Sequence, residues 1–368
     1  MRVTIVGGGL AGCITALELL RGPAAQGHDV TVLEREAAPY TTLCAEGLSD
    51  ATITAFSAFD SRPYIAQSFE GARWAFPGTV VDVHDRGHTM ARERWIPAMA
   101  EAASKAGADL RFGEKVTAAR ARELRAACDV LVGCDGPGSV VRAVVGGAHA
   151  TSLGLQYRIE AKGEPDAWLE FFTDKRWSPE YAWVFPRGDI LNVGILAAQD
   201  GRDWERLDRF AASRGLEGRV LRREAYPIGF NGTRFGAGNV ALVGDAAGLT
   251  NPVTKGGMAA AVHAARLLAE TLRDGPPADA GARYDALLRG HPLTDPSYAE
   301  AERILRSWSN EEFSRVLRYA PKRLDVGNGS AKVRYAPQLL ATLATRPTKA
   351  RDVLTLARAF GLSRKWSW

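Results

Sequence analysis

Residues 2–12 read RVTIVGGGLAG, and this stretch decides how the chain begins to fold. Its first part is short and rich in β-branched residues, which is typical of a buried parallel strand. Gly7, Gly9 and Gly12 then allow a tight turn, close backbone approach to a pyrophosphate, and close packing of a helix on the strand. Helical apolar spacing in residues 13–20 predicts a helix whose N-terminus points free N–H groups at the phosphates.

A second predicted strand covers residues 30–33 and ends at Glu34, which lies 22 residues after Gly12. A carboxylate at this point accepts hydrogen bonds from both ribose hydroxyls and repels a 2′-phosphate. The strand, glycine turn, helix and second strand therefore predict a dinucleotide-binding unit. An ordinary surface glutamate at the end of a strand is the alternative interpretation of Glu34.

Two further glycine motifs follow, each directly after an apolar run. Residues 129–136 read DVLVGCDG, and residues 238–247 read GNVALVGDAA. The first places Asp135 and Gly136 beside the dinucleotide, and the second places Asp245 where its carboxylate accepts a ribityl hydroxyl. A lone GxGxxG is weak evidence, because glycine triplets occur by chance. The three motifs together, in this order, predict one FAD bound without a covalent link, and therefore redox chemistry.

Residues 251–257 read NPVTKGG and precede a helix predicted over residues 256–272. We expect this helix to point its N-terminus at the isoalloxazine, where backbone N–H groups stabilise negative charge at N1–C2=O of reduced flavin. A plain loop with an N-cap is the alternative. Arg92, at the head of a helix predicted over residues 92–106, either approaches the dinucleotide or is solvated. The residues expected to bind FAD are Gly7, Gly9, Leu10, Ala11, Gly12, Glu34, Arg35, Cys44, Arg92, Val116, Asp135, Gly136, Gly244, Asp245, Pro252, Gly256 and Gly257.

The periodicity predicts an α/β fold (α+β overall), with a Rossmann-like FAD-binding domain that is discontinuous in sequence. Between its parts, aromatic and alternating apolar residues predict an inserted antiparallel sheet that forms a substrate domain. The FAD-binding domain is expected at residues 1–66, 90–150 and 229–290, the substrate domain at residues 67–89 and 151–228, and a basic helical region at residues 291–368.

Composition excludes several classes of protein. No run of about 20 apolar residues exists, so no transmembrane helix is predicted, and glycine turns and Glu18 argue against a signal peptide. The four cysteines lack CxxC spacing, which predicts neither a zinc site nor a disulfide framework and favours a reducing cytoplasmic location. His84 and His88 are interpreted as surface residues, so no metal site is expected. The basic residues match no nucleic-acid-binding module.

Two further segments carry a family resemblance. Residues 39–47 read PYTTLCAEG, and residues 181–186 read YAWVFP, followed by NVG at residues 192–194. The order of the motifs resembles the para-hydroxybenzoate-hydroxylase-type flavoproteins, and these two segments resemble the geranylgeranyl reductase family within that group, over roughly residues 1–275. Ala45 stands where that family usually has glycine. The resemblance implies that FAD, reduced by an external donor, hydrogenates isolated C=C bonds in polyprenyl chains.

This chemistry requires that hydride from flavin N5 be matched by a proton for the neighbouring carbon. Cys44 is the candidate proton donor or positioning group, and a small buried hydrophobe is the alternative. Tyr181, Trp183 and Phe185 alternate along a predicted strand, so they share one face. We expect them to take part in catalysis by lining an apolar tunnel over the flavin; in the alternative interpretation they fill the core of the sheet.

The C-terminus is basic, with ten Lys and Arg against two Asp in residues 322–368 of a chain whose net charge is +5. Apolar and basic residues alternate in residues 348–362, and tryptophans stand among the last residues. One interpretation is a helix that rests on an anionic membrane surface, at the inner face, which suits a lipid substrate. The other is a helix packed on the body of the protein.

Three other functions stay open at this point. A flavin monooxygenase acting on an aromatic or polyketide-like metabolite would use the same scaffold, because a fold does not fix its chemistry. Halogenation is disfavoured, since halogenases need a lysine in the N-terminal third and this chain has none before Lys105. A non-enzymatic FAD-stabilised binding protein would leave Cys44 and the aromatic strand unexplained.

NAD(P)H or a ferredoxin is the expected electron donor.

Overall fold

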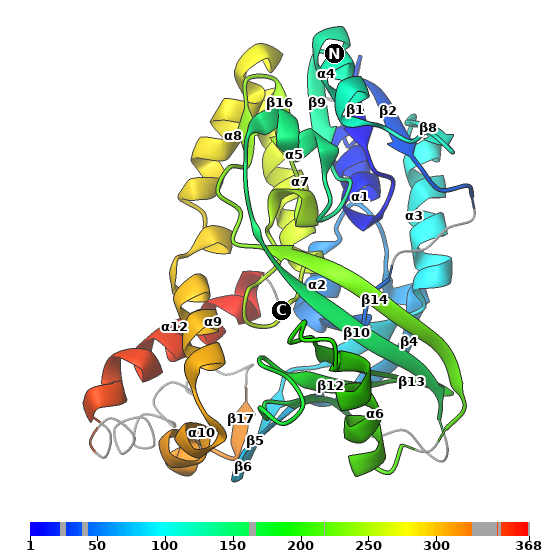
Figure 1. Ribbon diagram of the computed structural model, residues 1–368. Coiled ribbons are helices and arrows are strands. Elements are labelled where there is room, and N and C mark those ends of the chain that lie inside the picture. The colour runs from blue at the N-terminus through cyan, green and yellow to red at the C-terminus, as the bar shows by residue number, and fades with distance from the viewer. Residues whose placement is uncertain are drawn as a thin grey trace.

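The computed structural model describes residues 1–22, 27–38, 43–161, 167–216, 218–325, 344 and 347–366. Within these residues the strands form three sheets, of six, eight and three strands. Figure 1 shows the first sheet with helices α1, α7 and α8 in the upper part of the molecule, and the long strands β10 and β14 running from it into the lower part. The expected mixture of a Rossmann-like α/β unit and an antiparallel sheet is confirmed.

The six-stranded sheet collects the three glycine motifs. Its strands in spatial order are β15 (Gly236–Ala237), β16 (Val240–Leu242), β9 (Val130–Gly133), β1 (Arg2–Val6), β2 (Asp29–Glu34) and β8 (Asp109–Phe112). All neighbours are parallel except β15 and β16. Because Ile5 is in register with Val32 on one side and Val132 on the other, the carboxyl ends of these strands meet at one edge. The turns after β1, β9 and β16 therefore lie together, although they are far apart in the sequence.

Helices cover this sheet and begin close to where the sequence predicts them. Helix α1 (Leu10–Leu19) packs against α3 (Arg92–Lys105) and α7 (Met258–Arg273). Helix α3 stops before Gly107, whose φ of +108° lies in the left-handed region that favours glycine. The remaining helices of this part are α4 (Ala118–Ala127), α5 (Val140–Val145) and α8 (Ala280–Arg289).

The eight-stranded sheet confirms the predicted antiparallel region. Its strands in spatial order are β14 (Val220–Phe230), β10 (Ala150–Glu160), β13 (Ile190–Leu196), β12 (Ala182–Arg187), β11 (Trp168–Phe172), β5 (Gly71–Phe76), β6 (Thr79–His84) and β17 (Arg323–Asp325). Only the β11–β5 and β6–β17 pairs are parallel. Helix α6 (Asp203–Ser213) was not predicted; it buries Leu207, Phe210 and Ala211 against this sheet.

The smallest sheet contacts β12 of the eight-stranded sheet and has the order β3 (Gly47–Ser49), β7 (Gly87–Met90), β4 (Ile65–Phe69), with α2 (Asp50–Ala55) directly after β3. The expectation that His88 lies on the surface is wrong. Its ring is buried, with Nδ1 2.9 Å from the Ser68 hydroxyl and Nε2 3.1 Å from the Asp50 carboxylate. A short β-strand turned inward gives this histidine two polar partners, which is why the side chain can be buried.

The C-terminal part is largely helical, as expected, with α9 (Ser297–Ser307), α10 (Asn310–Val316) and α12 (Ala350–Trp366). Helix α12 packs on α9 and buries Leu356 and Ala359, while Leu354 is 51% exposed. One face of this helix therefore rests on the body of the protein. The terminal Ser367 and Trp368 lie outside the described residues. Among those that are described, no helix has both the length and the apolar character needed to cross a bilayer.

Candidate functional site

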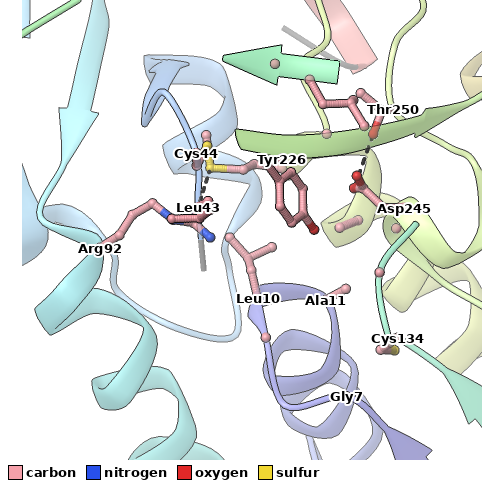
Figure 2. Close-up of a pocket in the computed structure, with 18 of the residues that line it drawn as sticks. Gly7, Leu10, Ala11, Leu43, Cys44, Arg92, Cys134, Tyr226, Asp245 and Thr250 are labelled. Atoms are coloured by element: carbon pink, nitrogen blue, oxygen red, sulfur yellow. Dashed lines mark hydrogen bonds between the residues drawn. The ribbon is translucent and has the colours of Figure 1, made fainter. Parts of the chain in front are cut away.

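A cavity of about 760 Å³ lies between the carboxyl edge of the six-stranded sheet and the inner face of the eight-stranded sheet. Figure 2 shows Leu10, Arg92, Tyr226 and Asp245 around it, each from a different element. Most residues expected to bind FAD or to act in catalysis line this one cavity. They are Gly7, Gly9, Leu10, Ala11, Glu34, Arg35, Cys44, Arg92, Val116, Asp135, Gly136, Tyr181, Trp183, Phe185, Gly244, Asp245, Gly256 and Gly257.

Gly12 and Pro252 are expected site residues that do not line the cavity. A Cβ at Gly12 would overlap the carbonyl oxygen of Gly7, so Gly12 serves the close packing of α1 on the loop after β1. The carbonyl oxygen of Pro252 accepts a hydrogen bond of 2.6 Å from Nζ of Lys255 and so supports the loop before α7. Both residues stand behind the surface that a ligand would touch.

The glycine turn at the start of α1 fits a pyrophosphate. Gly7 has a φ of +99°, and a Cβ there would overlap the carbonyl oxygen of Cys134, so the turn needs glycine for its conformation and for close approach. Helix α1 has no side-chain N-cap and no acidic residue in its first turn. Its first N–H groups and the positive end of its dipole therefore remain available to an anion at the cavity wall.

Glu34 is held in place for hydrogen bonding at the next part of the cavity. Its carboxylate accepts backbone N–H bonds from Gly8 at Oε2 (2.7 Å) and from Glu36 at Oε1 (2.9 Å). These two donors fix its orientation and leave further lone pairs on both oxygens. Arg35 and Val116 line the same part of the wall. The geometry agrees with ribose binding by Glu34, and the surface-glutamate interpretation is wrong because the side chain is buried.

Two buried aspartates follow along the cavity. Asp245 contacts the Thr250 hydroxyl at 3.2 Å and the Gly229 N–H at 3.4 Å, and burial raises the pKa of its carboxyl. Burial likewise raises the pKa of Asp135, whose Oδ1 accepts no hydrogen bond from any described residue. A buried acceptor without a donor costs free energy. This atom is therefore suited to a hydroxyl donor on a ligand, and the residues present fit FAD.

The far end of the cavity is aromatic. Tyr181, Trp183 and Phe185 all line it, as their alternation predicts, and the same side chains also pack in an apolar core cluster of the eight-stranded sheet. Phe171 also lines this end and lies edge-on to Phe185, with ring centroids 5.0 Å apart. The Tyr181 hydroxyl donates a 2.6 Å hydrogen bond to the carbonyl oxygen of Thr254, and burial raises the pKa of this phenol well above its usual value. The aromatic wall is thus fastened to the loop that precedes α7.

Cys44 lies between the two ends of the cavity. The residue is of intermediate exposure and lines the cavity. The Glu46 N–H donates to its Sγ at 3.2 Å. A Cβ on Gly47 would come within 2.9 Å of the Phe185 ring, so the loop packs tightly on the aromatic wall. Residues 39–42, the first part of the motif that includes Cys44, lie outside the described residues.

Several polar residues of the cavity were not predicted as site residues. They are Glu46, Gln156, Arg222, Glu224, Tyr226 and Lys255. Glu46 stands within the quoted segment PYTTLCAEG, which was one available sequence signal. The other is Lys255, which precedes the glycine pair of the α7 loop. Its Nζ is buried 2.5 Å from Oε2 of Glu180, and burial lowers its pKa. In the part of the chain that the structure describes, no group of three or more His, Cys, Asp and Glu residues is placed to hold a metal ion.

Comparison with known proteins agrees with this geometry. The model of the FAD binding domain family matches residues 1–277. A digeranylgeranylglycerophospholipid reductase of Methanothrix thermoacetophila is 30% identical over 307 residues, which cover 74% of this chain and 77% of the relative. The chain belongs to the geranylgeranyl reductase family. The resemblance drawn from the loop containing Cys44 and from the YAWVFP segment is confirmed.

Solved structures place this geranylgeranyl reductase family member in the same fold. A geranylgeranyl bacteriochlorophyll reductase-like protein of Thermoplasma acidophilum superposes with a TM-score of 0.76 at 19% identity, over 94% of this chain and 98% of that one. A flavin-dependent halogenase superposes with a TM-score of 0.64 at 18% identity, over 97% of this chain and 72% of that one. Two different chemistries thus share the scaffold. The expectations of FAD and of an oxidoreductase are confirmed by the family.

Proposed function

We propose that this protein reduces C=C bonds in the isoprenoid chain of a lipid or prenylated small molecule, with the chain held in the aromatic end of the cavity. One observation carries the proposal: a single cavity is lined both by the three dinucleotide motifs and by Tyr181, Trp183 and Phe185. FAD, when bound, supplies the hydride. Relatives named for digeranylgeranylglycerophospholipid and geranylgeranyl diphosphate reduction support the substrate class.

The chemistry of an isolated alkene explains the aromatic wall. Such a bond has no polar group for the protein to bind or polarise, so the chain must be oriented by apolar contact alone. Burial of apolar area contributes about 25 cal/mol per Å², and stiff aromatic side chains hold a fixed shape. Phe171, Leu196 and Ile228 extend the same surface. These residues bind the chain and keep water away from the reacting carbons.

Cys44 is proposed to deliver the proton to the second carbon of the double bond. Its Sγ lies at the cavity surface, on the loop that packs against Phe185. The Glu46 N–H that contacts Sγ fixes the direction of the thiol and accommodates the charge left on sulfur after proton transfer. A positioned acid of this kind typically contributes about 10²–10⁴-fold in rate.

Electron supply and membrane contact complete the proposal. NAD(P)H or a ferredoxin is proposed to reduce the flavin. The face of α12 turned away from the body carries exposed Leu354 and Arg351, a pair suited to the surface of an anionic bilayer that holds a lipid substrate. An adverse result for either point would leave the alkene reduction itself unaffected.

The test is product analysis by mass spectrometry. FAD-loaded protein, reduced with dithionite without oxygen, is incubated with a panel of geranylgeranyl lipids and prenylated quinones. The proposal predicts products heavier by multiples of two hydrogens. Unchanged lipids throughout the panel would refute it, and incorporation of oxygen during aerobic turnover would point to the monooxygenase instead.

A further inference from the structure

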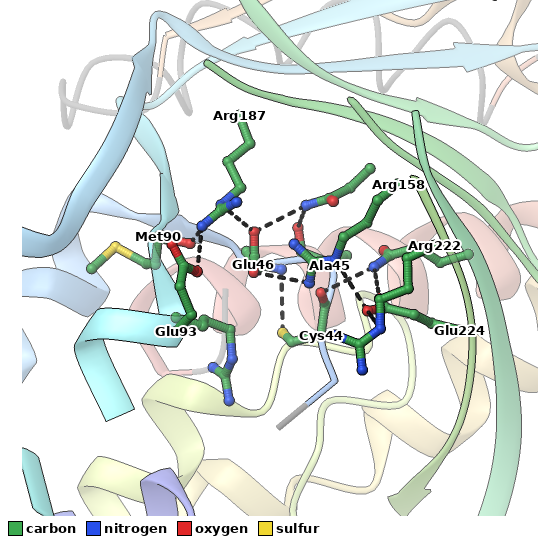
Figure 3. Close-up of polar contacts among 12 residues, drawn as sticks. Cys44, Ala45, Glu46, Met90, Glu93, Arg158, Arg187, Arg222 and Glu224 are labelled. Carbon is green, nitrogen blue, oxygen red and sulfur yellow. Dashed lines mark hydrogen bonds and ion pairs between the residues drawn. The ribbon is translucent and has the colours of Figure 1, made fainter. Parts of the chain in front are cut away.

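We propose that Glu46 is a positioning residue for Cys44, and that a buried network of charged and amide side chains holds it in that role. This inference rests on the proposed function, in which Cys44 donates the proton. The network, here called the Glu46 cluster, is drawn in Figure 3 and reaches Glu46 from four strands of the eight-stranded sheet. Its members are Glu46, Gln156, Arg158, Arg187, Asn192 and Glu224.

The carboxylate of Glu46 is fixed from three directions. Its side chain is only 1% exposed. Arg158 Nη2 contacts Oε1 at 3.1 Å, while Arg187 Nε and Asn192 Nδ2 contact Oε2 at 2.9 and 3.1 Å. Figure 3 shows Glu46 between the two guanidinium groups. Charge-assisted hydrogen bonds of this kind are the strongest that side chains form, so this carboxylate is firmly located.

The backbone of the Cys44 loop is held by the same cluster. Glu46 has a φ of +72°, a left-handed conformation that is unfavourable for a residue other than glycine. In this conformation its N–H donates to Cys44 Sγ. Gln156 Nε2 donates to the Cys44 carbonyl at 3.3 Å, and Asn192 Nδ2 donates to the Ala45 carbonyl at 3.0 Å. Three consecutive residues are therefore fixed by side chains from the sheet below them.

The cluster also reaches the aromatic wall. Trp183 pairs in register with Gly194, Gly194 with Gln156, and Gln156 with Glu224, so these four residues form one row across the sheet. A side chain on Gly194 would overlap the Trp183 indole, so glycine lets the indole lie across the row. Trp183 Nε1 then donates to Gln156 Oε1 at 3.3 Å. The Cys44 thiol and the aromatic wall of the cavity are thus positioned by one connected set of hydrogen bonds.

Arg158 is the centre of this arrangement. Its Nη2 bonds Glu46, and its Nε bonds Glu224 at 3.1 Å. Glu224 Oε2 in turn accepts a 2.7 Å hydrogen bond from Gln156 Nε2. The planar fork of a guanidinium holds two carboxylates at fixed angles, whereas an ammonium is a point charge without that fixed geometry. Loss of Arg158 would break the link between the two buried carboxylates and leave Glu46 paired with Arg187 alone and Glu224 with the more exposed Arg222.

A purely stabilising role is a weak explanation for the cluster. Burying ions costs desolvation, and buried ion pairs can often be replaced by apolar side chains without loss of stability. The cluster instead pairs its two carboxylates with Arg158 and Arg187 at the foot of one functional loop, and Arg222, whose side chain is 58% exposed, adds a third guanidinium group 3.3 Å from Glu224. This pairing of charges keeps the neighbouring aromatic end of the cavity free of an unpaired charge, and it specifies a single geometry for the Cys44 loop.

The experiment compares Glu46→Gln, Arg158→Met and their double variant in the FAD-loaded protein. We expect amide hydrogen exchange in residues 44–49 to be at least about tenfold faster in all three, and kcat with a reducible prenyl lipid to fall about a hundredfold, as for misplaced catalytic groups. FAD affinity should stay within about twofold. The double variant should regain thermal stability that each single change loses, because it removes one buried charge of each sign, without regaining kcat or exchange protection.

Two further variants separate the effect of the guanidinium geometry from that of its charge and from an unrelated ion pair. Arg158→Lys keeps the charge without the fork and should behave like Arg158→Met in kcat. Arg219→Gln is the matched control, because Arg219 belongs to an exposed pair with Glu160 (3.6 Å) at the edge of the same sheet, and its side chain is 74% exposed. This control should equal the wild-type protein in exchange, stability and kcat.

Exchange in residues 44–49 is measured without any substrate, so this inference and the proposed function fail separately. Wild-type exchange in Glu46→Gln would overturn the positioning role. Recovery of kcat together with stability in the double variant would also overturn it, since the cluster would then act on stability alone. Absence of prenyl reduction by the wild-type protein would reject the proposed function and leave the exchange result to decide the role of Glu46.

Discussion

At the dinucleotide end of the cavity the wall is largely backbone, supplied by turns at the ends of β1, β9 and β16, whereas at the aromatic end it is side chains from the face of the eight-stranded sheet. Gly7, where a Cβ would overlap the Cys134 carbonyl, is typical of the first end. Trp183, whose indole crosses Gly194, is typical of the second. A backbone wall accepts only a ligand of fixed shape, while a side-chain wall can be altered one residue at a time. We therefore expect changes at the first end to remove the cofactor and changes at the second to alter turnover.

The largest effect is predicted for Gly7→Ala. The added Cβ would meet the Cys134 backbone, and alanine is strained at a φ of +99°. FAD affinity should fall by more than about a hundredfold, as measured by flavin absorbance after gel filtration. Gly113→Ala is the control, because Gly113 also has a positive φ (+75°) but nothing lies within 4 Å of an added Cβ. Stoichiometric FAD in Gly7→Ala would break the comparison.

Cys44→Ala is predicted to lower kcat with a prenyl lipid by about 10²–10⁴-fold, the usual contribution of a general acid. FAD should remain bound, because Cys44 belongs to the side-chain part of the wall. Cys128→Ala is the matched control, since Cys128 is also a partly exposed free cysteine but does not line the cavity. Equal kcat values for the two variants, determined from anaerobic turnover, would remove Cys44 from the mechanism.

Acid should weaken the dinucleotide half through His263 in α7. Burial lowers the pKa of this imidazole from 6.5 to about 4. The unfolded chain therefore binds a proton that the folded chain does not, so stability is retained above about pH 6.5 and is lost as the pH falls towards 4. His263→Gln should make urea unfolding less sensitive to pH across this window. An unchanged pH dependence would show that other groups control acid unfolding.

The smallest effect is predicted for Tyr181→Phe, which keeps the ring and removes the hydroxyl that donates to Thr254. Loss of one buried hydrogen bond should cost about 1–2 kcal/mol in the free energy of unfolding. The KM for a prenyl lipid should change by less than about threefold, because the apolar surface is kept. Chemical denaturation and steady-state kinetics check both values; a loss of FAD would show that the two ends are not separable.

The same difference explains what could be predicted from the sequence. Turns that need a positive φ or a missing Cβ demand glycine at fixed spacing, so Gly7 and Gly244 could be read directly. Alternation along a strand likewise placed Tyr181, Trp183 and Phe185 on one face. Both signals are local, and both describe residues that line the cavity.

The Glu46 cluster could not be predicted, because its members meet only through sheet register. Gln156 and Glu224 become neighbours when β10 pairs with β14, and Asn192 joins Arg158 when β10 pairs with β13. Such pairings depend on the whole sheet. Glu46 and Asn192 stand in the quoted segments PYTTLCAEG and NVG, but neither segment indicates which residues their side chains meet. Helix α6 carries buried Leu207, Phe210 and Ala211 at helical spacing, so its signal was local and was overlooked. His88 was missed because the burial of a polar residue on a strand is decided by its tertiary partners.

The most direct test of the account follows the flavin itself. Protein with FAD reduced by dithionite is mixed, without oxygen, with a geranylgeranyl lipid or with its fully saturated analogue. The account predicts that the absorbance of oxidised flavin returns with the unsaturated lipid only, in step with a gain of two hydrogens per flavin in the lipid. Flavin that stays reduced until oxygen is admitted would contradict it.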